Sequence, residues 1–540
     1  MNRMRWVVSK VNKRLTIQSA AILLAGSTLI SSFLGLYRDR ILNSMYYDTY
    51  KVGLDAYVYA FQVPDFMFFI LVSGALSVTF IPVFNQRLAT GNKKSAWQLS
   101  SSLINFMALT TLVASILIII FAEPLIGLIA NGLDESGREL AISLMRVIAV
   151  NPFLFAIATV IASMQQAIGR FTFFALAPTI YNIGIIIGAL FFTNGISLFG
   201  VQIFEGGIMG VALGVVLGSI MQLIVSSIGL LGLGFDYQFK IRWKNKGFRK
   251  VLGLLPARSL DQGMDYFVSL FELRLASHME SGVARAYQQA LALHMMPVNL
   301  VGVAISTAAF PSMTEHLGSG NVSRFRQELQ QILRVIVWLA LPIAIITYFT
   351  RGFVVSFVKN GGDSLMAGIL GALVVAILFR TIYHIAARSF YAQQDTKTPL
   401  YISLFSIALN IGLALWFTQS LKMGAYGLAF AQSIVAFVEV VILFGIMQLR
   451  IEGGIFDRRM VQGLVKMAVA SGLMAFITYG MVQLFQLQSN DMSLSQTLPK
   501  FLLIVAVSAI FYVWLGTRLR LGEAHTVSEK MKKIAFSRRV

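Results

Sequence analysis

The sequence predicts an all-α polytopic membrane protein, and three observations lead to that fold class. Of the 540 residues, 57% are hydrophobic and only 13% are charged, and the mean hydropathy is +0.74. Soluble domains usually carry about 25% charged residues. Long apolar runs recur along the chain, and Lys and Arg gather in the short connections between them. Little polar sequence remains, so we expect no sizeable soluble domain.

The net charge of +20 fits a membrane protein better than a nucleic-acid-binding protein. Basic residues beside membrane spans contact anionic lipid head groups and orient the chain by the positive-inside rule. The chain has no cysteine, which excludes disulfides, thiolate metal sites and a cysteine nucleophile. The N-terminus resembles the basic region of a signal peptide, but its apolar segment leads into further spans. We therefore interpret it as a retained first span.

About 20 apolar residues cross the hydrocarbon core of a bilayer. On that measure we expect about fourteen transmembrane helices. They lie near residues 16–36, 54–82, 99–121, 139–165, 172–193, 206–233, 251–276, 284–311, 328–349, 366–391, 399–418, 424–447, 461–485 and 498–517.

Basic connections alternate with connections that are poor in Lys and Arg. An even number of spans with both termini in the cytoplasm satisfies this alternation. The basic segments are the N-terminus with Arg3, Arg5, Lys10, Lys13 and Arg14, the loops with Arg87, Lys93, Lys94 and Lys240 to Lys250, and the C-terminal part with Arg450, Arg458, Arg459 and Arg518 to Arg539.

The chain also repeats itself. ALSVTFIPVFNQRLATGN at 75–92 aligns with AISTAAFPSMTEHLGSGN at 304–321, an offset of 229 residues. At an offset of 228, the Gln-Gln pair at 165–166 and Asn182 match the Gln-Gln pair at 393–394 and Asn410. Chance similarity between apolar segments is the alternative explanation.

We interpret the repeat as a duplication, which divides the chain into three parts. Residues 1–235 form an N-terminal lobe of spans 1–6, residues 236–450 form a C-terminal lobe of spans 7–12, and residues 451–540 add spans 13–14 and a basic cytoplasmic tail. Transporters are often built from such repeats, with the substrate site where the halves meet.

Span 7 is unusual because it carries charges inside an apolar stretch. Arg258, Asp265 and Glu272 recur every seventh residue and so share one helix face, with Asp261 close to it. Ionisable groups in a span usually face a polar interior. Arg258 and Asp261 could form an i,i+3 ion pair. Asp265 and Glu272 have no cation at helical spacing, and two carboxylates in a cavity could bind Na⁺ or exchange protons.

Span 10 carries Arg380, His384 and Arg388, which are four residues apart and lie on one face. Facing lipid, each arginine would cost about 2.5–3.5 kcal/mol. Facing a cavity, the three would form a cationic strip suited to phosphate, because guanidinium binds phosphate oxygens in a fork. For Arg388 the alternative is that it extends to the membrane surface.

Further candidates lie at span ends and at prolines. Arg38, Asp39 and Arg40 end span 1 and Asp55 opens span 2, where interface residues need no special role. Pro64 in span 2 and Pro297 in span 8 each remove a backbone hydrogen-bond donor, so we expect a kink in each helix. Kinked helices in both halves are compatible with gating movements. The alternative is a static role, because membrane helices also tolerate proline without moving.

Signatures of catalysis and of metal binding are missing from the sequence. His278, His294 and His316 show no ligand spacing, so we expect no metal beyond Na⁺ at Glu272. We find no phosphate loop, catalytic triad or paired carboxylates placed for chemistry. We therefore expect a transporter rather than an enzyme, without a cofactor apart from Na⁺ or H⁺ coupling.

Five stretches resemble the MurJ/MviN family of lipid II flippases, which belongs to the multidrug/oligosaccharidyl-lipid/polysaccharide exporter superfamily. They are GLYRDR at 35–40, LDAYVYAFQVPD at 54–65, SGALSVTFIPVF at 73–84, PVNLVGVAISTAAFPSMTEH at 297–316 and ARSFYAQQDTKTP at 387–399. The resemblance covers essentially the whole chain.

The resemblance implies a multi-pass protein of the bacterial inner membrane that acts in peptidoglycan synthesis, cell wall biogenesis and cell shape. Its substrate would be a lipid-linked disaccharide-pentapeptide, moved by alternating access and driven by ions or membrane potential. We expect a monomer in contact with anionic lipids, with cell wall synthesis or division proteins as further partners and no nucleic acid.

The resemblance carries over to only some positions. The family's Arg-Asp pair is present as Arg38-Asp39, and the acid that opens span 2 is present as Asp55. At five other positions where the family has a basic or acidic residue, this chain has an uncharged one: Ser32, Gln62, Phe68, Ser73 and Ala292. Arg258, Arg380 and Arg388 are candidates to replace the missing cations. Some relatives bind Na⁺ through an acid in span 7, which aligns with Glu272, and the implied partners are Asn410 and Ser433.

The leading hypothesis is a flippase for lipid II, with Arg38, Arg258 and Arg380 holding the anionic head group. The first alternative is a flippase for another lipid-linked glycan or a drug/cation antiporter, and the loss of family arginines is its support. A transport-inactive scaffold is a second alternative, which the charges inside spans 7 and 10 disfavour. A glycan polymerase is disfavoured because no substantial extracellular loop carries a catalytic carboxylate.

Overall fold

The structure, a computed structural model, describes residues 17–73, 80–198, 201–204, 206–488, 491–525 and 529. Over these residues it is built almost entirely of helices, and it divides into two compact units, residues 1–284 and 285–540. The predicted all-α class is therefore confirmed. The predicted division into three parts stays a prediction.

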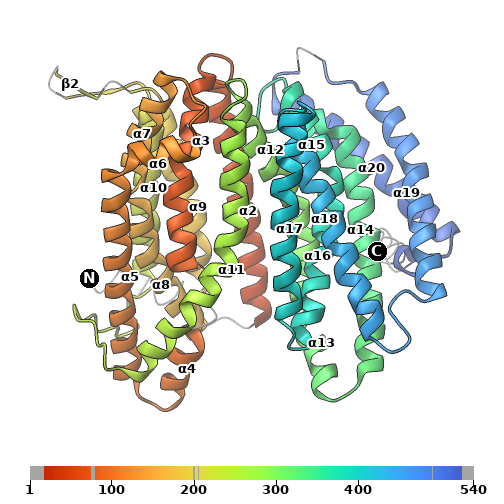
Figure 1. Cartoon of the computed structure of the whole chain (residues 1–540), viewed down its shortest axis with the longest axis horizontal. Coiled ribbons are helices and arrows are strands. Elements are labelled where there is room, and N and C mark those ends of the chain that lie inside the picture. Colours follow the sequence, from red (N-terminus) through yellow and green to blue (C-terminus); the bar gives the residue numbers. More distant parts are fainter. Residues whose placement is uncertain are drawn as a thin grey trace, which may run out of the picture. The chain divides into compact units, whose positions relative to one another are not determined.

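The first unit holds long helices and one short hairpin. In Figure 1 α9 packs along α10 and α5 along α8. Its elements are α2 (Ile17–Tyr46), α3 (Lys51–Phe68), η1 (Phe69–Ser73), α4 (Ile81–Ala89), α5 (Lys93–Ile120), α6 (Ala122–Ile129), α7 (Glu135–Ile148), α8 (Asn151–Ile168), α9 (Thr172–Ile187), η3 (Gly188–Phe192), β1 (Ile196–Leu198), β2 (Val201–Phe204), α10 (Ile208–Ile228) and α11 (Lys246–Ala276).

The second unit also consists of long helices. Within it α16 packs on α18 and α14, and α14 also packs on α19. Its elements are α12 (Val283–Pro297), η4 (Val298–Val303), α13 (Ala304–Gly318), α14 (Val322–Ser356), α15 (Ser364–Ala372), α16 (Val374–Ala392), α17 (Lys397–Leu415), η5 (Trp416–Ser420), α18 (Ala425–Arg450), α19 (Arg458–Leu484) and α20 (Leu494–Arg518).

Among the described residues, eleven helices are long and apolar enough to cross a membrane, or twelve if the bent pair α15 and α16 forms one span. The predicted count of fourteen is therefore not confirmed. The other two predicted ranges coincide with α2 and α11. Both helices are long, and α11 carries many charges, which lowers its hydropathy.

Hydrogen bonds from a neighbouring helix stabilise the 44° bend between α15 and α16. The hydroxyl of Ser433 in α18 donates to the Ala372 carbonyl at 2.6 Å and accepts from the Ala376 amide at 3.2 Å. Backbone groups freed at a break in a membrane helix need such partners, because the hydrocarbon offers none. Ser433 therefore stabilises the bend.

The predicted duplication reappears in the positions of unusual helical turns. A π-helical segment begins at Phe69 in the first unit and at Val298 in the second, which is the sequence offset of 229. A second pair begins at Gly188 and Trp416, which is the offset of 228. The bounds of the corresponding helices thus follow the sequence repeat.

The caps of two corresponding helices also match. Asn92 caps α5 by accepting a hydrogen bond from the Ser95 amide at 2.9 Å, and Asn321 caps α14 by accepting from the Arg324 amide at 3.1 Å. An asparagine side chain satisfies an amide that the first turn of a helix leaves unbonded. The same local solution at an offset of 229 residues supports a common origin of the two stretches.

Glycines let α9 and α10 approach closely. Gly184 of α9 and Gly188 of η3 face Gly210, Gly214 and Gly218 of α10, and a Cβ atom on Gly214 would lie 2.6 Å from the Gly188 Cα. Such small-xxx-small patterns are typical of packed membrane helices. The sequence analysis did not identify this contact.

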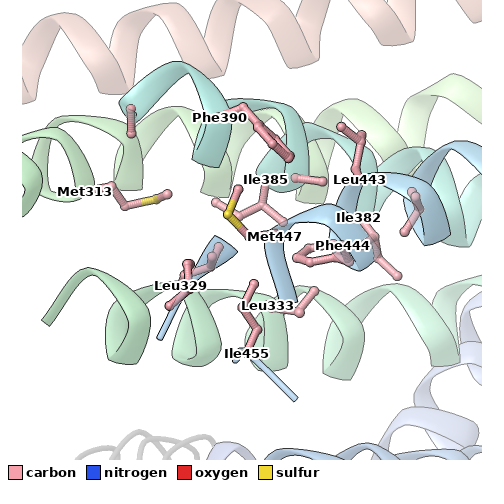
Figure 2. Close-up of a cluster of buried hydrophobic side chains, with 14 of the residues drawn as sticks. Met313, Leu329, Leu333, Ile382, Ile385, Phe390, Leu443, Phe444, Met447 and Ile455 are labelled. Atoms are coloured by element: carbon pink, nitrogen blue, oxygen red, sulfur yellow. The ribbon is translucent and has the colours of Figure 1, made fainter. Parts of the chain in front are cut away.

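Each unit has an apolar core of its own. In the first, Phe80, Phe84, Trp97 and Phe248 are buried together. In the second, Figure 2 shows Leu329 and Leu333 of α14 facing Ile385 and Met447. These side chains hold the helices that carry the polar residues described below.

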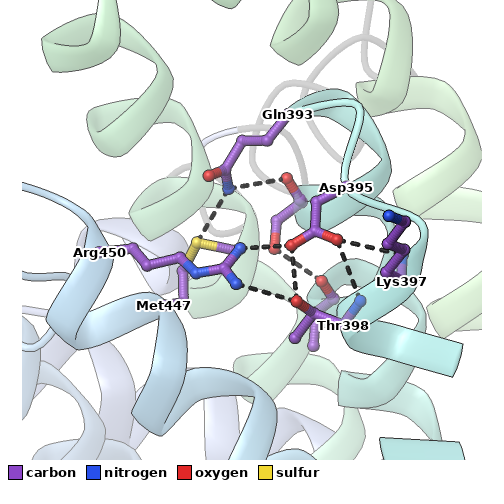
Figure 3. Close-up of polar contacts among 8 residues, drawn as sticks. Gln393, Asp395, Lys397, Thr398, Met447 and Arg450 are labelled. Carbon is purple, nitrogen blue, oxygen red and sulfur yellow. Dashed lines mark hydrogen bonds and ion pairs between the residues drawn. The ribbon is translucent and has the colours of Figure 1, made fainter. Parts of the chain in front are cut away.

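The turn between α16 and α17 is closed by polar contacts of Asp395 with Lys397, Thr398 and Arg450, which we call the Asp395 latch. Asp395 accepts hydrogen bonds from the amides of Lys397 and Thr398 and forms an ion pair with Arg450 at the end of α18 (Figure 3). Partial burial opposes ionisation, but hydrogen bonds from Thr398 and Arg450 outweigh it and hold the pKa of Asp395 well below its usual range. The latch therefore depends on an ionised carboxylate.

Candidate functional site

The first unit contains a charged cluster where α2 meets α9. The Arg38 guanidinium donates to Asp39 Oδ1 at 3.0 Å and, through Nη1, to Asn182 Oδ1 at 2.9 Å. The Asn182 amide in turn donates to the Ser31 hydroxyl at 3.3 Å. Asp39 and Asn182 are buried, whereas the Arg38 side chain is about a quarter exposed. The cluster thus presents an oriented guanidinium with accessible surface.

Asp55 has a structural partner in the same unit. Its carboxylate accepts a hydrogen bond from the amide of Gly282, in the connection between α11 and α12, and Asp55 is buried. One turn further along α3, the Tyr59 hydroxyl donates to the Leu273 carbonyl at 2.9 Å. These contacts join α3 to the end of α11. Asp55 therefore positions a helix connection.

A second carboxylate of α3 also faces α11. The Tyr266 hydroxyl donates to Asp65 Oδ2 at 3.4 Å, and Phe69 packs against the same tyrosine ring. Asp65 follows Pro64 directly, so it lies where the helix changes to the π-helical segment η1. π-Helical turns often occur at functional sites. This placement agrees with the predicted gating position at Pro64 but does not test it.

The second unit contains a buried ion pair between α16 and α18. Arg380 Nη1 lies 3.4 Å from Glu439 Oε2, and Arg380 Nη2 donates to Gln432 at 3.4 Å. The Ser403 hydroxyl of α17 donates to Glu439 Oε1, also at 3.4 Å. The side chain of Glu439 is 3% exposed and that of Arg380 is 28% exposed. Arg380 is therefore held by the buried Glu439 carboxylate while part of its own side chain stays accessible.

The polar face of α17 continues past this pair. Ser406 and Asn410 follow Ser403 at helical spacing and are both buried. Within the described part of the chain, Ser406 Oγ and Asn410 Oδ1 have no hydrogen-bond partner. Buried oxygens usually have partners, so these two atoms call for an explanation. They are free to take a ligand.

The other members of the span 10 strip differ from Arg380. Arg388 Nη1 donates to the Val303 carbonyl at 3.3 Å and to the Thr307 hydroxyl, so it satisfies the loosened backbone of η4. His384 lies beside Gly302 of the same segment. Arg380 in contrast pairs with a carboxylate, that of Glu439. The predicted continuous cationic strip therefore includes one residue that mainly supports η4.

The remaining predicted residues fall in different environments. Glu272 of α11 is fully buried, Ser433 stabilises the α15–α16 bend, and Arg40 is partly exposed at the end of α2. Pro297 ends α12, immediately before η4. The side chains of three predicted residues of α11 lie outside the described residues: Arg258, Asp261 and Asp265.

No group of three or more His, Asp or Glu side chains that could hold a metal ion occurs among the described residues. Among these residues, a site for Na⁺ would therefore combine at most two carboxylates with hydroxyl, amide and carbonyl oxygens. Hard cations accept such oxygen ligands.

Three residues were missed by the sequence analysis. Glu439 is a lone carboxylate within an apolar span, a signal that marks functional positions and that was available in the sequence. Arg285 is buried near the start of α12. Asn182 was noticed only for the repeat, and its bond to Arg38 depends on the packing of α9 against α2, which no spacing reveals.

Together these features define a polytopic membrane transporter of two repeated halves, with charged clusters inside its membrane helices. A family model, described as lipid II flippase MurJ, matches residues 50–500. The chain therefore belongs to the MurJ family of lipid II flippases.

Known relatives agree with this assignment. The chain is 24% identical over 525 residues to a probable lipid II flippase MurJ of Bdellovibrio bacteriovorus, covering 94% of this chain and 95% of the relative. It is 26% identical over 458 residues to a probable lipid II flippase MurJ of Thermotoga maritima, covering 83% and 88%.

Solved structures share the fold. A lipid II flippase MurJ in an inward closed conformation matches with a TM-score of 0.73 and 24% identity, over 91% of this chain and 99% of that one. An inward-facing MATE-family multidrug resistance transporter matches with a TM-score of 0.67 and 16% identity, over 80% of this chain and 98% of that one.

Proposed function

We propose that this chain moves lipid II across the bacterial cytoplasmic membrane for peptidoglycan synthesis. The observation that carries the proposal is the family match over residues 50–500, which includes the Arg380–Glu439 ion pair. Charged residues inside membrane helices are expensive and usually mark substrate or ion pathways. Transport breaks no covalent bond, so the protein acts as a transporter rather than an enzyme.

Alternating access is the proposed mechanism. It is supported by the fold, since this chain matches MATE-family transporters in both inward-facing and outward-facing conformations. Opening to each face in turn would let the head group cross while the lipid tail stays in the bilayer. Pro64 and Pro297, each close to a π-helical segment, are the proposed gating positions.

Arg38 and Arg380 are the main candidates for the pyrophosphate. Each guanidinium is oriented by a buried carboxylate and a side-chain amide, yet about a quarter of its side chain remains accessible. A guanidinium can bind phosphate oxygens through two parallel hydrogen bonds. Arg40, Arg258 and Arg388 would add positive charge, whereas Asp39 and Asp55 would hold Arg38 and the α11–α12 connection in place.

Cation coupling is the second part of the proposal. Glu272 is fully buried, and the unpaired oxygen of Asn410 is an available ligand. We propose that Na⁺ or H⁺ binding at such groups, with Asp265 and Ser433 as further candidates, biases the change between conformations. Uptake of a cation beside a buried carboxylate offsets its desolvation cost.

Orientation and partners complete the proposal. Both termini would lie in the cytoplasm, because the basic connections then face the anionic leaflet. A monomer contains all the clusters described above. Proteins of cell wall synthesis or division are the proposed partners on the basic loops.

Depletion rescue tests the function. The chain is expressed in a bacterium whose own MurJ flippase is depleted, and growth and cell shape are recorded. We expect rescue by the wild-type chain and its loss in Arg38→Ala, Arg258→Ala, Arg380→Ala and Glu272→Ala. Lys93→Ala, an exposed residue at the start of α5, is the matched control and should rescue. Failure of a well-expressed wild-type chain would contradict lipid II as the substrate.

A second candidate function is transport of another lipid-linked glycan or antiport of a drug against a cation. The MATE-family structural matches favour it. Fluorescent cation efflux from cells that express the chain, without flippase rescue, would support this candidate. A transport-inactive scaffold would give neither activity but would still recruit division proteins.

A further inference from the structure

A groove of about 700 Å³ opens on the first unit between α5, α8 and the segment that precedes α11. This volume lies within the roughly 300–1,000 Å³ of typical ligand sites. Its two helical walls are apolar and regular. On α8 the wall consists of Phe153, Ile157 and Ile161, and on α5 it includes Ala108 and Leu112, so each wall repeats every four residues.

The third wall is an irregular segment, residues 235–241, that side chains of α5 hold in place. The Asn105 amide donates to the Gln238 carbonyl at 2.8 Å, and the Ser101 hydroxyl accepts from the Gln238 amide at 3.2 Å. One residue along α5, the Ser102 hydroxyl accepts from the Arg242 amide at 3.1 Å. These bonds fix the backbone of the segment against α5 at Gln238 and Arg242.

Most side chains that this segment contributes to the groove are aromatic or aliphatic. They are Phe235, Tyr237, Phe239 and Ile241. The Tyr237 hydroxyl is hydrogen-bonded to Asn105, so the polar atoms on the groove floor are satisfied. The groove wall is therefore apolar and already formed.

The groove opens onto surface that faces lipid. Leu109 of the groove and Val113 one turn beyond it are each about half exposed, in the apolar part of α5. The preceding stretch, KKSAWQLSSS at 93–102, is polar enough for the membrane interface. The groove therefore starts near the interface and runs into the hydrocarbon layer.

The mouth of the groove is basic. Lys240 lines it directly, and Arg242 is held nearby by a 2.6 Å hydrogen bond to the Gln238 side chain. Residues 236–250 contain six Lys or Arg and a single acid, Asp236, which accepts a hydrogen bond from Gln238. Basic pockets between membrane helices bind anionic lipid head groups. Neither residue belongs to the clusters assigned to the transported substrate.

We infer that this groove is a binding site for an anionic glycerophospholipid. One acyl chain lies between α5 and α8 against the aromatic segment, and the phosphate contacts Lys240 and Arg242. The lipid would fix the segment that leads into α11. The inference rests on the groove alone and does not depend on which substrate the chain transports.

Native mass spectrometry of the purified full chain tests the site, with dioleoyl phosphatidylglycerol compared with dioleoyl phosphatidylcholine. We expect phosphatidylglycerol to bind more tightly. Ala108→Trp fills the groove and should lower its affinity at least about tenfold, the factor that corresponds to about 1.4 kcal/mol. Val113→Trp adds the same bulk to the same helix outside the groove and should change affinity less than about twofold.

The head group is tested by the double variant Lys240→Gln and Arg242→Gln. Removing two basic residues near a membrane surface should lower phosphatidylglycerol affinity by about thirtyfold, roughly fivefold for each. Lys93→Gln with Lys94→Gln removes the same charge from exposed positions at the start of α5 and should have little effect. Phosphatidylcholine affinity should stay unchanged in both double variants.

Several outcomes would overturn the inference. They are equal affinity for the two lipids, wild-type binding by Ala108→Trp, competition by inorganic phosphate alone, or displacement of phosphatidylglycerol by undecaprenyl phosphate at equal concentration. The last result would indicate a groove for the substrate tail. If Ala108→Trp does not fold, as judged by thermal unfolding in detergent, Leu112→Trp replaces it, because Leu112 is more exposed and lines the same groove.

Discussion

Arg380 and Glu439 form an ion pair inside the second unit, with 3.4 Å between Nη1 and Oε2, and the carboxylate is almost completely buried. Water cannot solvate that carboxylate, so its charge depends on Arg380, Ser403 and the protein around them. Arg380 in contrast reaches accessible surface. A ligand phosphate that approached Arg380 would therefore compete with Glu439 for the same guanidinium.

Breaking this pair should be costly. Arg380→Ala removes the arginine partner of a buried carboxylate, and we expect the free energy of unfolding to fall by about 3–5 kcal/mol. The combined Arg380→Met and Glu439→Leu exchange should recover most of that loss, because an apolar pair needs no charge compensation. Thermal unfolding in detergent measures the stability of each variant.

Depletion rescue separates structure from function in the same variants. We expect the stable double variant to remain unable to rescue growth, because it lacks the guanidinium. Rescue by the double variant would show that the pair is structural only.

Asn182 should control the orientation of Arg38. Asn182→Ala removes the acceptor of Arg38 Nη1 in a buried site, so stability should fall by about 1–3 kcal/mol. Asn182→Asp keeps the acceptor oxygen and should restore rescue activity. Asn194→Ala, at an exposed position after η3, is the control for losing an asparagine. Equal behaviour of the Asn182→Ala and Asn194→Ala variants would contradict the role.

The Asp395 latch predicts a pH dependence. Its pKa in the folded protein lies below the unfolded value of about 3.9, so the ionised latch stabilises the fold above that pH. Asp395→Asn should cost about 1 kcal/mol at pH 7, the difference between charged and neutral hydrogen bonds. The cost should shrink as the pH falls below about 4, because the carboxylate of the unfolded wild-type chain then binds a proton before that of the folded chain does.

Thermal unfolding from pH 3 to pH 8 measures that difference. Glu452→Gln removes a charge from an exposed site two residues after Arg450 and should show no such trend. A cost that stayed constant down to pH 3 would mean that hydrogen-bond geometry, and not charge, holds the turn.

The glycine contact of α9 and α10 should tolerate no side chain. Gly214→Val places carbon atoms against the Gly188 backbone, and we expect destabilisation of about 3 kcal/mol, at the upper end of overpacking costs. Gly472→Ala in α19 meets open space and should be neutral or stabilising. Detergent melting curves test both, and a Gly214→Val variant as stable as wild type would contradict the close approach.

The helical class, the repeat and the charge of span 10 could be predicted because each is a local pattern. Hydropathy reveals long spans, and spacing by four places Arg380, His384 and Arg388 on one face. The charges of α11 lower its hydropathy below that of the other spans, and fourteen spans are not confirmed. Asn182 and Gly214 could not be assigned, because their roles come from a neighbouring helix. Glu439 was visible but was overlooked inside its apolar run.

The matched π-helical segments carry information about ancestry. π-Helical turns are rare in helices and frequent at functional sites. Segments begin at Phe69 and Val298, and again at Gly188 and Trp416, which is the pattern expected if a single ancestral copy already contained these turns. Glycine stands at one of these positions and tryptophan at its counterpart, so the side chains at the turns differ. On the predicted duplication, the turns are therefore older than the sequence differences between the two halves.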